Sequence, residues 1–307
     1  MNPAYSVILF TTASGAGYGL LGLLGMAGAS HGRASTMGFA LTSMGIALAL
    51  ITVGLLSSTF HLGRPERAWR AFSQWRTSWL SREGILAILL YPVALAFFLA
   101  WSGLIEAPSL IAPLGWLMAI LCWFTVFCTA MIYASLKTIP AWNSRLTVAG
   151  YLTFSAATGA TWLAVVAFAF GRFVPFQSIL ASASILATLL VKFIYWRRLD
   201  KRMKSYTMAN ATGLGEGVRQ WEVPHTAQNF IMKEMGYAVA RNHARKLRRW
   251  CLFLLDITFF LMAFAGDHPW LSIVALPLIM VAAWVERWLF FAQAEHVVGL
   301  YYGKPAV

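Results

Sequence analysis

Long apolar runs, bounded by charged or turn-forming residues, recur along almost the whole chain. Each run is about 20 residues long, which is the length an α-helix needs to cross roughly 30 Å of hydrocarbon. None alternates apolar and polar residues as the strands of a membrane β-barrel do. The pattern therefore predicts an all-α, polytopic membrane protein of about eight transmembrane helices, near residues 5–29, 36–60, 84–105, 110–136, 146–171, 176–196, 250–266 and 269–293.

The composition agrees with this pattern. Of the 307 residues, 59% are hydrophobic and 11% are charged, whereas soluble proteins carry about 25% charged residues. We therefore expect one integral membrane domain over residues 1–307. The first apolar run lacks the basic segment and cleavage site of a secretory signal, so we expect it to be retained as a helix. The cysteines Cys122, Cys128 and Cys251 lie inside predicted helices without a CxxC spacing, and no metal site is predicted.

The distribution of charge predicts the orientation. The formal net charge is +13, but the basic residues lie almost entirely in loops, where anionic lipid and orientation explain them better than nucleic acid does. Eight spans place both termini on the same side as the second, fourth and sixth connections. The second and fourth connections carry Arg64, Arg67, Arg70, Arg76, Arg82, Lys137 and Arg145, whereas the opposite connections carry Arg33 and Arg172. The positive-inside rule then places both termini in the cytoplasm. We expect a multi-pass protein of the bacterial inner membrane.

The sixth connection, about residues 197–249, is long and basic. A polar, glycine-containing part is followed by a basic part that is compatible with an amphipathic helix. Such a helix can lie on anionic lipid or dock a cytosolic partner, and the sequence leaves both alternatives open.

Glycines are frequent in the first apolar run, SGAGYGLLGLLGMAGA. No strand precedes them and no acidic residue follows at the spacing of a dinucleotide fold, so they do not indicate a nucleotide loop. Gly15, Gly19 and Gly22 are spaced so as to share one face of a helix. We expect this face to allow close approach of a neighbouring helix.

The connection STFHLGRPERAWRAFSQWRTSWLSREG is the segment most suggestive of chemistry. An ordinary positive-inside loop anchored by Trp explains its aromatic residues and most of its Arg. It explains His61 and Glu83 less well, since these lie at facing helix ends and at similar depth. A His and a carboxylate flanking one small cavity can relay protons, as quinone chemistry requires, although a lone His is more often only a hydrogen-bonding group.

A few ionisable residues lie inside the predicted spans. Lys192, Asp256, Glu286 and Arg287 all fall in the cytoplasmic half, roughly 8 to 10 Å below the helix ends. Charges at this depth usually pair or line a wet cavity, so we expect Lys192 to pair with Asp256, with an internal contact of Glu286 or Arg287. Snorkelling of Lys192 and Arg287 to the interface is the alternative. No two His residues face each other at mid-membrane, and we predict no haem.

Four segments, FHLGRPERAWRAF, WLSREG, MIYASLKTIPAWNS and VERWLFFAQAEH, resemble the membrane-anchor subunits of the dimethyl sulfoxide reductase type. The likeness spans almost the whole chain. It implies a complex of three subunits, in which a molybdopterin subunit carries out the substrate chemistry. An iron–sulfur subunit exchanges electrons with quinone or quinol bound at the anchor. The iron–sulfur clusters and the molybdopterin are then expected in the partners, not in this chain.

The resemblance also implies a quinone site. The family's quinol-site His and Glu fall on His61 and Glu83, and Arg64 and Arg67 belong to the same motif. Further family-like positions with less defined roles are Tyr133, Trp142, Asn143, Glu286 and Arg287.

Two features depart from the enteric sulfoxide reductase anchors: the long basic sixth connection and the cytoplasmic placement of the motif loop. The chain looks more like the anchor of the cytoplasm-facing sulfite dehydrogenase, which oxidises sulfite to sulfate and reduces quinone. Basic loops complementary to an acidic partner on the other side would weaken the orientation argument. One alternative function is the anchor of a sulfoxide or N-oxide reductase that oxidises quinol. Another, of a different class, is a transporter or structural scaffold, although no internal repeat is evident.

Overall fold

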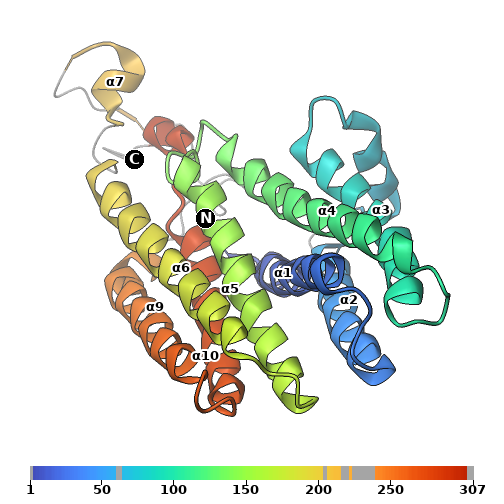
Figure 1. The fold of residues 1–307 in the computed structure, drawn as a ribbon. Helices are drawn as coiled ribbons and strands as arrows, with labels where there is room; N and C mark the ends of the chain where they lie inside the picture. Colours follow the sequence, from blue (N-terminus) through green and yellow to red (C-terminus); the bar gives the residue numbers. More distant parts are fainter. Residues whose placement is uncertain (1–2, 60–63, 203–205, 216–220, 223–238, 303–307) are drawn as a thin grey trace.

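The computed structural model describes residues 3–59, 64–202, 206–215, 221–222 and 239–302. No β-strand occurs in these ranges, and eight long helices account for most of them (Figure 1). They are α1 (Tyr5–His31), α2 (Met37–Thr59), α3 (Trp79–Trp101), α4 (Pro108–Ala134), α5 (Arg145–Ala169), α6 (Pro175–Arg202), α9 (Val239–Phe264) and α10 (Leu271–Ala292). Three short helices, η1 (Pro65–Gln74), α7 (Met208–Thr212) and η2 (Val297–Tyr302), lie between or after them.

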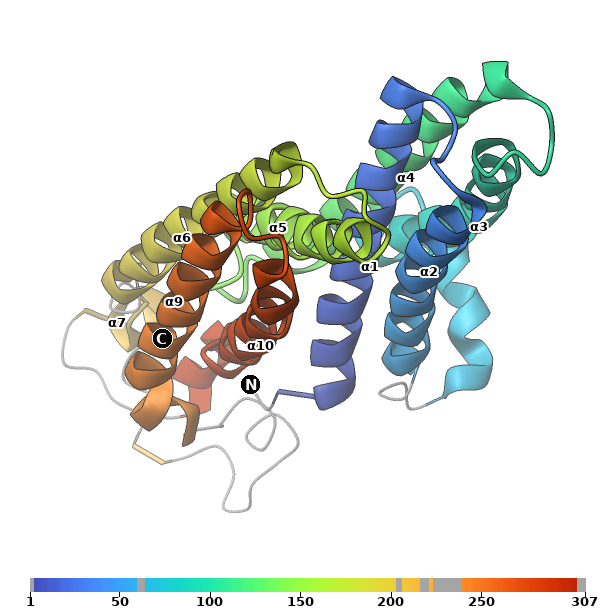
Figure 2. The ribbon, with the colours of Figure 1, turned by 60° about the horizontal axis from the view of Figure 1, so that its bottom comes forward.

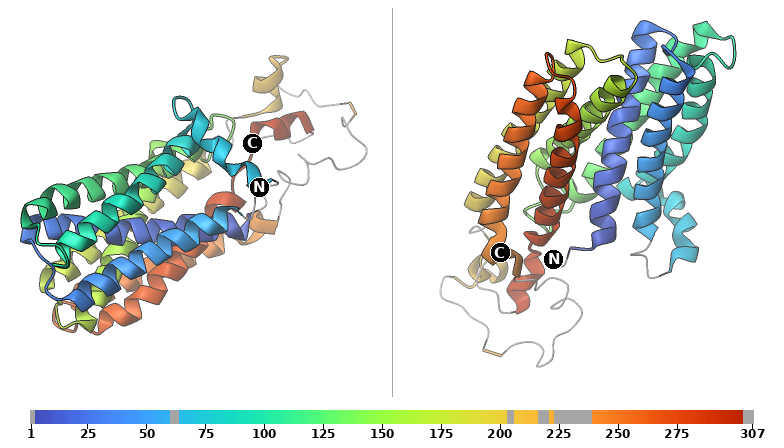
Figure 3. Two further views of the ribbon diagram at one scale, coloured as in Figure 1. Left: turned by 90° about the vertical axis from the view of Figure 1, so that its right-hand side faces the viewer. Right: turned by 90° about the horizontal axis from the view of Figure 1, so that it is seen from below.

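The long helices confirm the prediction of an all-α polytopic membrane protein. Seven of the helices in the described ranges are long and apolar enough to cross a membrane. The eighth long helix, α9, carries Arg248, Arg249 and Asp256 next to or within its apolar stretch, which lowers its hydropathy. It nevertheless lies alongside α6 and α10 within the bundle (Figure 3).

The helices form two groups of four. The first group holds α1 to α4, and the second holds α5, α6, α9 and α10, each of which contacts its neighbours in a ring (Figure 2). The central element is α1, which contacts α2 and α4 in its own group and α5 and α10 in the other. In its most apolar stretch, 83% of the α1 residues are buried, more than in any other candidate span. The boundary between the groups therefore lies along α1.

Glycines allow α1 to approach its neighbours closely. A Cβ atom on Gly19 would overlap the backbone oxygen of Ser155 on α5, and one on Gly22 would lie 3.2 Å from the Trp123 indole nitrogen on α4. The predicted close approach is thus confirmed for these two glycines. It is wrong for Gly15, which has no such neighbour within 4 Å. The Gly15 carbonyl instead accepts a hydrogen bond of 2.6 Å from the Ser155 hydroxyl.

Helix α3 begins about one turn earlier than the sequence pattern predicts. Ser78 is its N-cap, because the Ser78 hydroxyl accepts a hydrogen bond from the Ser81 amide at 3.4 Å. Glu83 consequently lies inside the second turn of α3 and not at its entrance. At the sixth connection, α6 and α9 extend beyond their predicted ends, so basic residues on both sides of that connection are helical. Most of the predicted amphipathic segment lies outside the described residues.

The two ends of the bundle differ in charge. The N-terminus of α1, η1, α7 and η2 lie at one end, which we name the basic end (Figure 3). The short connections 32–36, 102–107, 170–174 and 265–270 lie at the opposite end. There, Arg33 is 3.6 Å from Glu106, which offsets its charge. The uneven distribution of basic residues between the connections therefore corresponds to a difference in charge between the two ends of the folded bundle.

Candidate functional site

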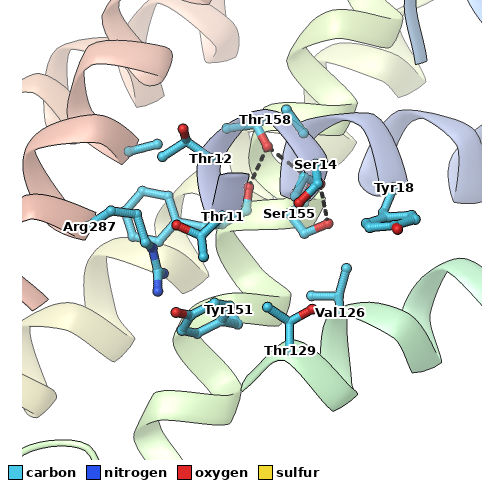
Figure 4. Close-up of a pocket in the computed structure, with 14 residues that line it drawn as sticks. Thr11, Thr12, Ser14, Tyr18, Val126, Thr129, Tyr151, Ser155, Thr158 and Arg287 are labelled. Atoms are coloured by element: carbon cyan, nitrogen blue, oxygen red, sulfur yellow. Dashed lines mark hydrogen bonds between the residues drawn. The ribbon is translucent and has the colours of Figure 1, made fainter. Parts of the chain in front are cut away.

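A narrow crevice lies where the two helix groups meet, between α1, α4, α5 and α10. Its volume is about 20 Å³, which is about the size of one water molecule. Its polar wall residues are Thr11, Thr12, Ser14, Tyr18, Thr129, Tyr151, Ser155, Thr158 and Arg287 (Figure 4). A crevice this polar is unusual inside an apolar bundle, where each uncompensated polar group is costly.

Most hydroxyls of the crevice are bonded within the bundle. Thr12, Ser14 and Thr158 each donate to the carbonyl four residues earlier in the same helix. The Tyr18 phenol differs, since it is 1% exposed and has no hydrogen-bond partner within the described ranges. A buried hydroxyl left unpaired costs about 1–3 kcal/mol. Tyr18 is therefore a place where water or a polar ligand would be stabilised.

Glu83 adjoins this crevice. Its side chain is 3% exposed, and one carboxylate oxygen accepts a short hydrogen bond from the hydroxyl of Thr129, a crevice residue on α4. No Lys, Arg or His nitrogen of the described residues lies within the 4 Å of an ion pair with it. Acidic side chains are seldom buried without a cation. Glu83 is therefore placed as a group that can take up or release a proton.

A buried ion cluster reaches the crevice through Arg287, which is part of the crevice wall. Lys192 of α6 pairs with one carboxylate oxygen of Glu286, and the Arg287 Nε lies 2.8 Å from the other. The Arg287 guanidinium also stacks on the ring of Tyr151, 3.7 Å from its centroid. The cluster combines two cations with one anion. Glu83 and Glu286 are the two buried acids of the described residues, and Glu83 makes no ion pair with this cluster.

This cluster corrects one prediction and confirms another. Lys192 pairs with Glu286 and not with Asp256, which is exposed on the outer face of α9. Helical spacing explains the difference, because Asp256 shares its face with the exposed rings of Phe253 and Phe260. The predicted contact between Glu286 and Arg287 is present. Lys192 and Arg287 do not snorkel, since both are buried against their partners.

Two family-like aromatic residues lie next to the crevice. The Tyr133 ring is 5.2 Å from that of Trp142 and 5.8 Å from that of Tyr151, measured between centroids. The Trp142 indole donates to the Phe290 carbonyl at 2.8 Å, which fixes the end of α10 against the connection after α4. Tyr133 and Trp142 thus support the wall that holds Tyr151 and Arg287.

The other predicted site residues lie elsewhere or cannot be located. Asn143 donates to the Ala134 carbonyl at 2.6 Å and so closes the end of α4. Arg64 and Arg67 are exposed on or beside η1 and do not line the crevice. His61 lies outside the described residues, and its place beside Glu83 stays a prediction. No group of three His, Cys, Asp or Glu residues suited to a metal occurs in the described ranges.

Sequence reasoning missed three residues: Tyr18, Thr129 and Tyr151. A signal for Tyr18 exists, because Thr11, Ser14 and Tyr18 follow at i, i+3 and i+7 and so form a polar stripe on an apolar helix. Thr129 and Tyr151 lack such a local signal. Their importance depends on which helices face each other.

Comparison with known proteins gives the family. Residues 1–303 match the family described as DMSO reductase anchor subunit (DmsC). A sulfite dehydrogenase subunit of Allochromatium vinosum is 32% identical over 327 aligned positions, which cover 100% of both chains. The resemblance drawn from the four motif segments is confirmed. The chain belongs to the DMSO reductase anchor subunit family, and it is a membrane-anchor subunit of an oxidoreductase complex.

Proposed function

We propose that this anchor subunit binds quinone at the basic end, beside Glu83, and exchanges electrons between quinone and an iron–sulfur partner. A molybdopterin subunit of the same complex would carry the substrate site. The observation that carries the proposal is the Glu83 carboxylate, which is buried, free of a cation among the described residues and linked through Thr129 to a polar crevice.

The residues around the crevice fit a quinone headgroup. Its oxygens need a hydrogen-bond donor and a proton-exchanging group, and Tyr18 and Glu83 offer these. The rings of Tyr151 and Phe154 supply apolar wall. As it stands the crevice is too narrow for a headgroup, so binding there has to move its side chains apart.

Bound quinone would supply two-electron chemistry coupled to two protons. The Glu83 carboxylate would take or give one proton at a quinone oxygen. The Thr129 hydroxyl donates to Glu83 and so holds the carboxylate in position. Arg287, on the wall formed by α10, adds a hydrogen-bond donor to the same crevice.

For the reaction of the complex, we propose the oxidation of sulfite to sulfate with reduction of quinone, on the cytoplasmic side. The support is the name of the full-length relative, which is a subunit of a sulfite dehydrogenase. The second candidate is reduction of a sulfoxide or N-oxide with quinol as donor, supported by the name of the family. Purified complex supplied with sulfite and quinone, or with quinol and dimethyl sulfoxide, separates the two by which mixture turns over.

The quinone site is tested with Glu83→Gln in the intact complex. This change keeps the shape of the side chain and removes its proton exchange, so we expect quinone-coupled turnover to fall by about 10²–10⁴-fold. Turnover with a soluble dye that accepts electrons directly from the partner subunits should stay unchanged. Undiminished quinone-coupled turnover would remove Glu83 from the site.

A matched control is Glu66→Gln. Glu66 is an exposed carboxylate of η1 at the same end of the bundle. It should leave both activities unchanged. Equal losses in the two variants would indicate a general effect of charge at the basic end and would contradict a specific role for Glu83.

A further inference from the structure

A surface groove lies between α6 and α9 at the basic end, away from the crevice. Its walls are Phe193, Trp196, Arg197 and Asp200 on α6, and Arg245, Arg248, Arg249 and Leu252 on α9. Its volume is about 470 Å³. Arg249 also lines an adjoining hollow on α9 formed with Lys246, Trp250 and Phe253. The two hollows meet at Arg249 and form one basic surface, which we name the α6–α9 groove.

Most of the positive charge in this groove is uncompensated. Arg248 is paired, because its Nη1 lies 2.7 Å from the Asp200 carboxylate and its Nε donates to Gln293 at 3.2 Å. Arg197, Arg245 and Arg249 have no carboxylate within 4 Å in the part of the chain that the structure describes. Three like charges around one hollow repel each other, and a bound anion would relieve that repulsion.

Below the guanidiniums the groove is apolar. Phe193 lies about one helical turn deeper than Arg197 along α6, and it is 45% exposed. On α9, Trp250 and Phe253 are 50% and 51% exposed. Arg197 itself belongs to the candidate membrane span of α6. A cationic rim above an open aromatic floor matches the order of phosphate and acyl chain in a lipid.

This arrangement favours a lipid over an acidic protein. A protein that approaches from the aqueous side would meet Arg245 and Arg249 but would leave the outward-facing rings of Phe193 and Phe253 uncovered. A phospholipid covers both levels at once, because its phosphate lies at the interface and its chains lie beside the helices.

We propose that the α6–α9 groove is a binding site for an anionic phospholipid. The phosphate lies among Arg197, Arg245 and Arg249, and an acyl chain follows Phe193 and Leu252 between the two helices. A headgroup with two phosphates, as in diphosphatidylglycerol, matches the three unpaired guanidiniums and the neighbouring Lys246 better than a single phosphate does. Such a lipid would bridge α6 and α9 where the long sixth connection separates them in sequence.

The wild-type chain alone provides the first test. The full-length protein, purified in detergent, is mixed with equal amounts of diphosphatidylglycerol, phosphatidylglycerol or phosphatidylcholine, and bound lipid is measured by native mass spectrometry. We expect retention to fall in that order, with at least a tenfold difference between the first and the last. Equal retention of all three lipids would overturn the proposal. So would full displacement of diphosphatidylglycerol by an equal concentration of inorganic phosphate, which would indicate a site for a free anion.

The second test removes the charges. Arg197→Gln/Arg245→Gln/Arg249→Gln should lower diphosphatidylglycerol retention at least tenfold, and the corresponding triple change to Lys should keep most of it. The control is Arg172→Gln, which removes an exposed charge at the opposite end and should change nothing. Unchanged lipid retention in the Gln variant would overturn the proposal, as would loss of a co-purifying partner protein with lipid retention intact.

Discussion

At the scale of single residues, charge balance decides what the buried groups can do. Glu286 lies between Lys192 and Arg287 and forms an ion pair with each of them. An unpaired charge in a low-dielectric interior costs far more than a paired one, and removal of one partner of a buried ion pair costs about 3–5 kcal/mol. The stability of the cluster should therefore depend more on its single anion, Glu286, than on either of its cations.

Glu286→Gln should accordingly be much more destabilising than Lys192→Met. The first change leaves two buried cations side by side, at a cost of about 3–5 kcal/mol in the free energy of unfolding. The second leaves the neutral pair of Glu286 and Arg287 at 2.8 Å, and it should cost less than half as much. Denaturant titration of the purified variants in detergent compares them. A larger loss for Lys192→Met would contradict control by charge balance.

His296 provides a pH-dependent contact outside the spans. Burial lowers the pKa of His296 below its ordinary value, and its Nδ1 accepts a hydrogen bond from the Val298 amide at 3.0 Å. The folded state therefore requires the neutral form of the His296 imidazole, because only an unprotonated Nδ1 can accept this hydrogen bond. Because the folded-state pKa is the lower one, the stabilisation is present above the unfolded pKa of about 6.5 and is lost as the pH falls below it.

We therefore expect η2 to loosen on acidification. Amide hydrogen exchange of Val298, corrected for the intrinsic rate, should show protection above pH ~7 that declines toward pH ~5. His296→Gln keeps an acceptor but does not titrate, so its protection should not decline in this range. His268→Gln, at the opposite end, serves as control and should behave as the wild type. Constant wild-type protection across this range would refute the role of His296.

Single residues also show how far sequence reasoning reaches. Glu286 and Arg287 were predictable, because a charged residue within an apolar run is conspicuous wherever it points. Glu83 was predictable as a carboxylate at the end of such a run. Whether such a residue faces the interior of the bundle or its outer surface was not always predictable. Asp256 has the sequence context of a buried charge, but the rotation of α9 about its own axis turns it outward. That rotation is set by contacts with α6 and α10, which local sequence does not specify.

At the scale of elements, close contact of α1 with α5 is the feature most sensitive to small changes. A methyl group at Gly19 would overlap the backbone of Ser155, whereas one at Gly15 meets nothing within 4 Å. The two glycines lie one helical turn apart on the same helix, so they form a matched pair for testing the contact.

Gly19→Ala should destabilise the chain by about 1–3 kcal/mol, because α1 and α5 have to move apart. Gly15→Ala should be neutral or stabilising by up to about 1 kcal/mol, since Ala is the better helix former. Thermal unfolding of the two variants in the same detergent compares them. Similar effects of both changes would indicate that backbone flexibility, and not the distance between helices, is what these glycines provide.

The existence of all eight long helices was predictable, but several of their ends were not. Hydropathy marks where a helix is apolar, and helices continue beyond that stretch when a cap or a neighbour supports them. Ser78 extends α3 in this way, which moves Glu83 from the helix entrance to its interior.

At the scale of the whole molecule, the crevice exists because two four-helix groups meet along α1. Its polar residues come from α1, α4, α5 and α10, which are far apart in sequence. Pairing between distant helices leaves no periodic signal within any one of them, so Thr129 and Tyr151 could not be assigned to a site from sequence. Both groups contribute side chains to its wall, Thr129 from the first group and Arg287 from the second.

The arrangement of the ends also gives the last prediction, which concerns topology. The start of α1 and the short helix η2 both lie at the basic end (Figure 3), which requires α9 and α10 to cross the membrane as a pair although α9 is less apolar than the other long helices. The positive-inside rule predicts that this end faces the cytoplasm. A fluorescent protein and alkaline phosphatase, fused separately after Val307 or within 206–215, should be fluorescent and inactive, respectively. The same reporters within 170–174 should give the reverse. Different locations for the reporters within 206–215 and after Val307 would mean that α9 does not cross the membrane. Phosphatase activity at both sites would reverse the orientation and place the partner subunits outside the cytoplasm.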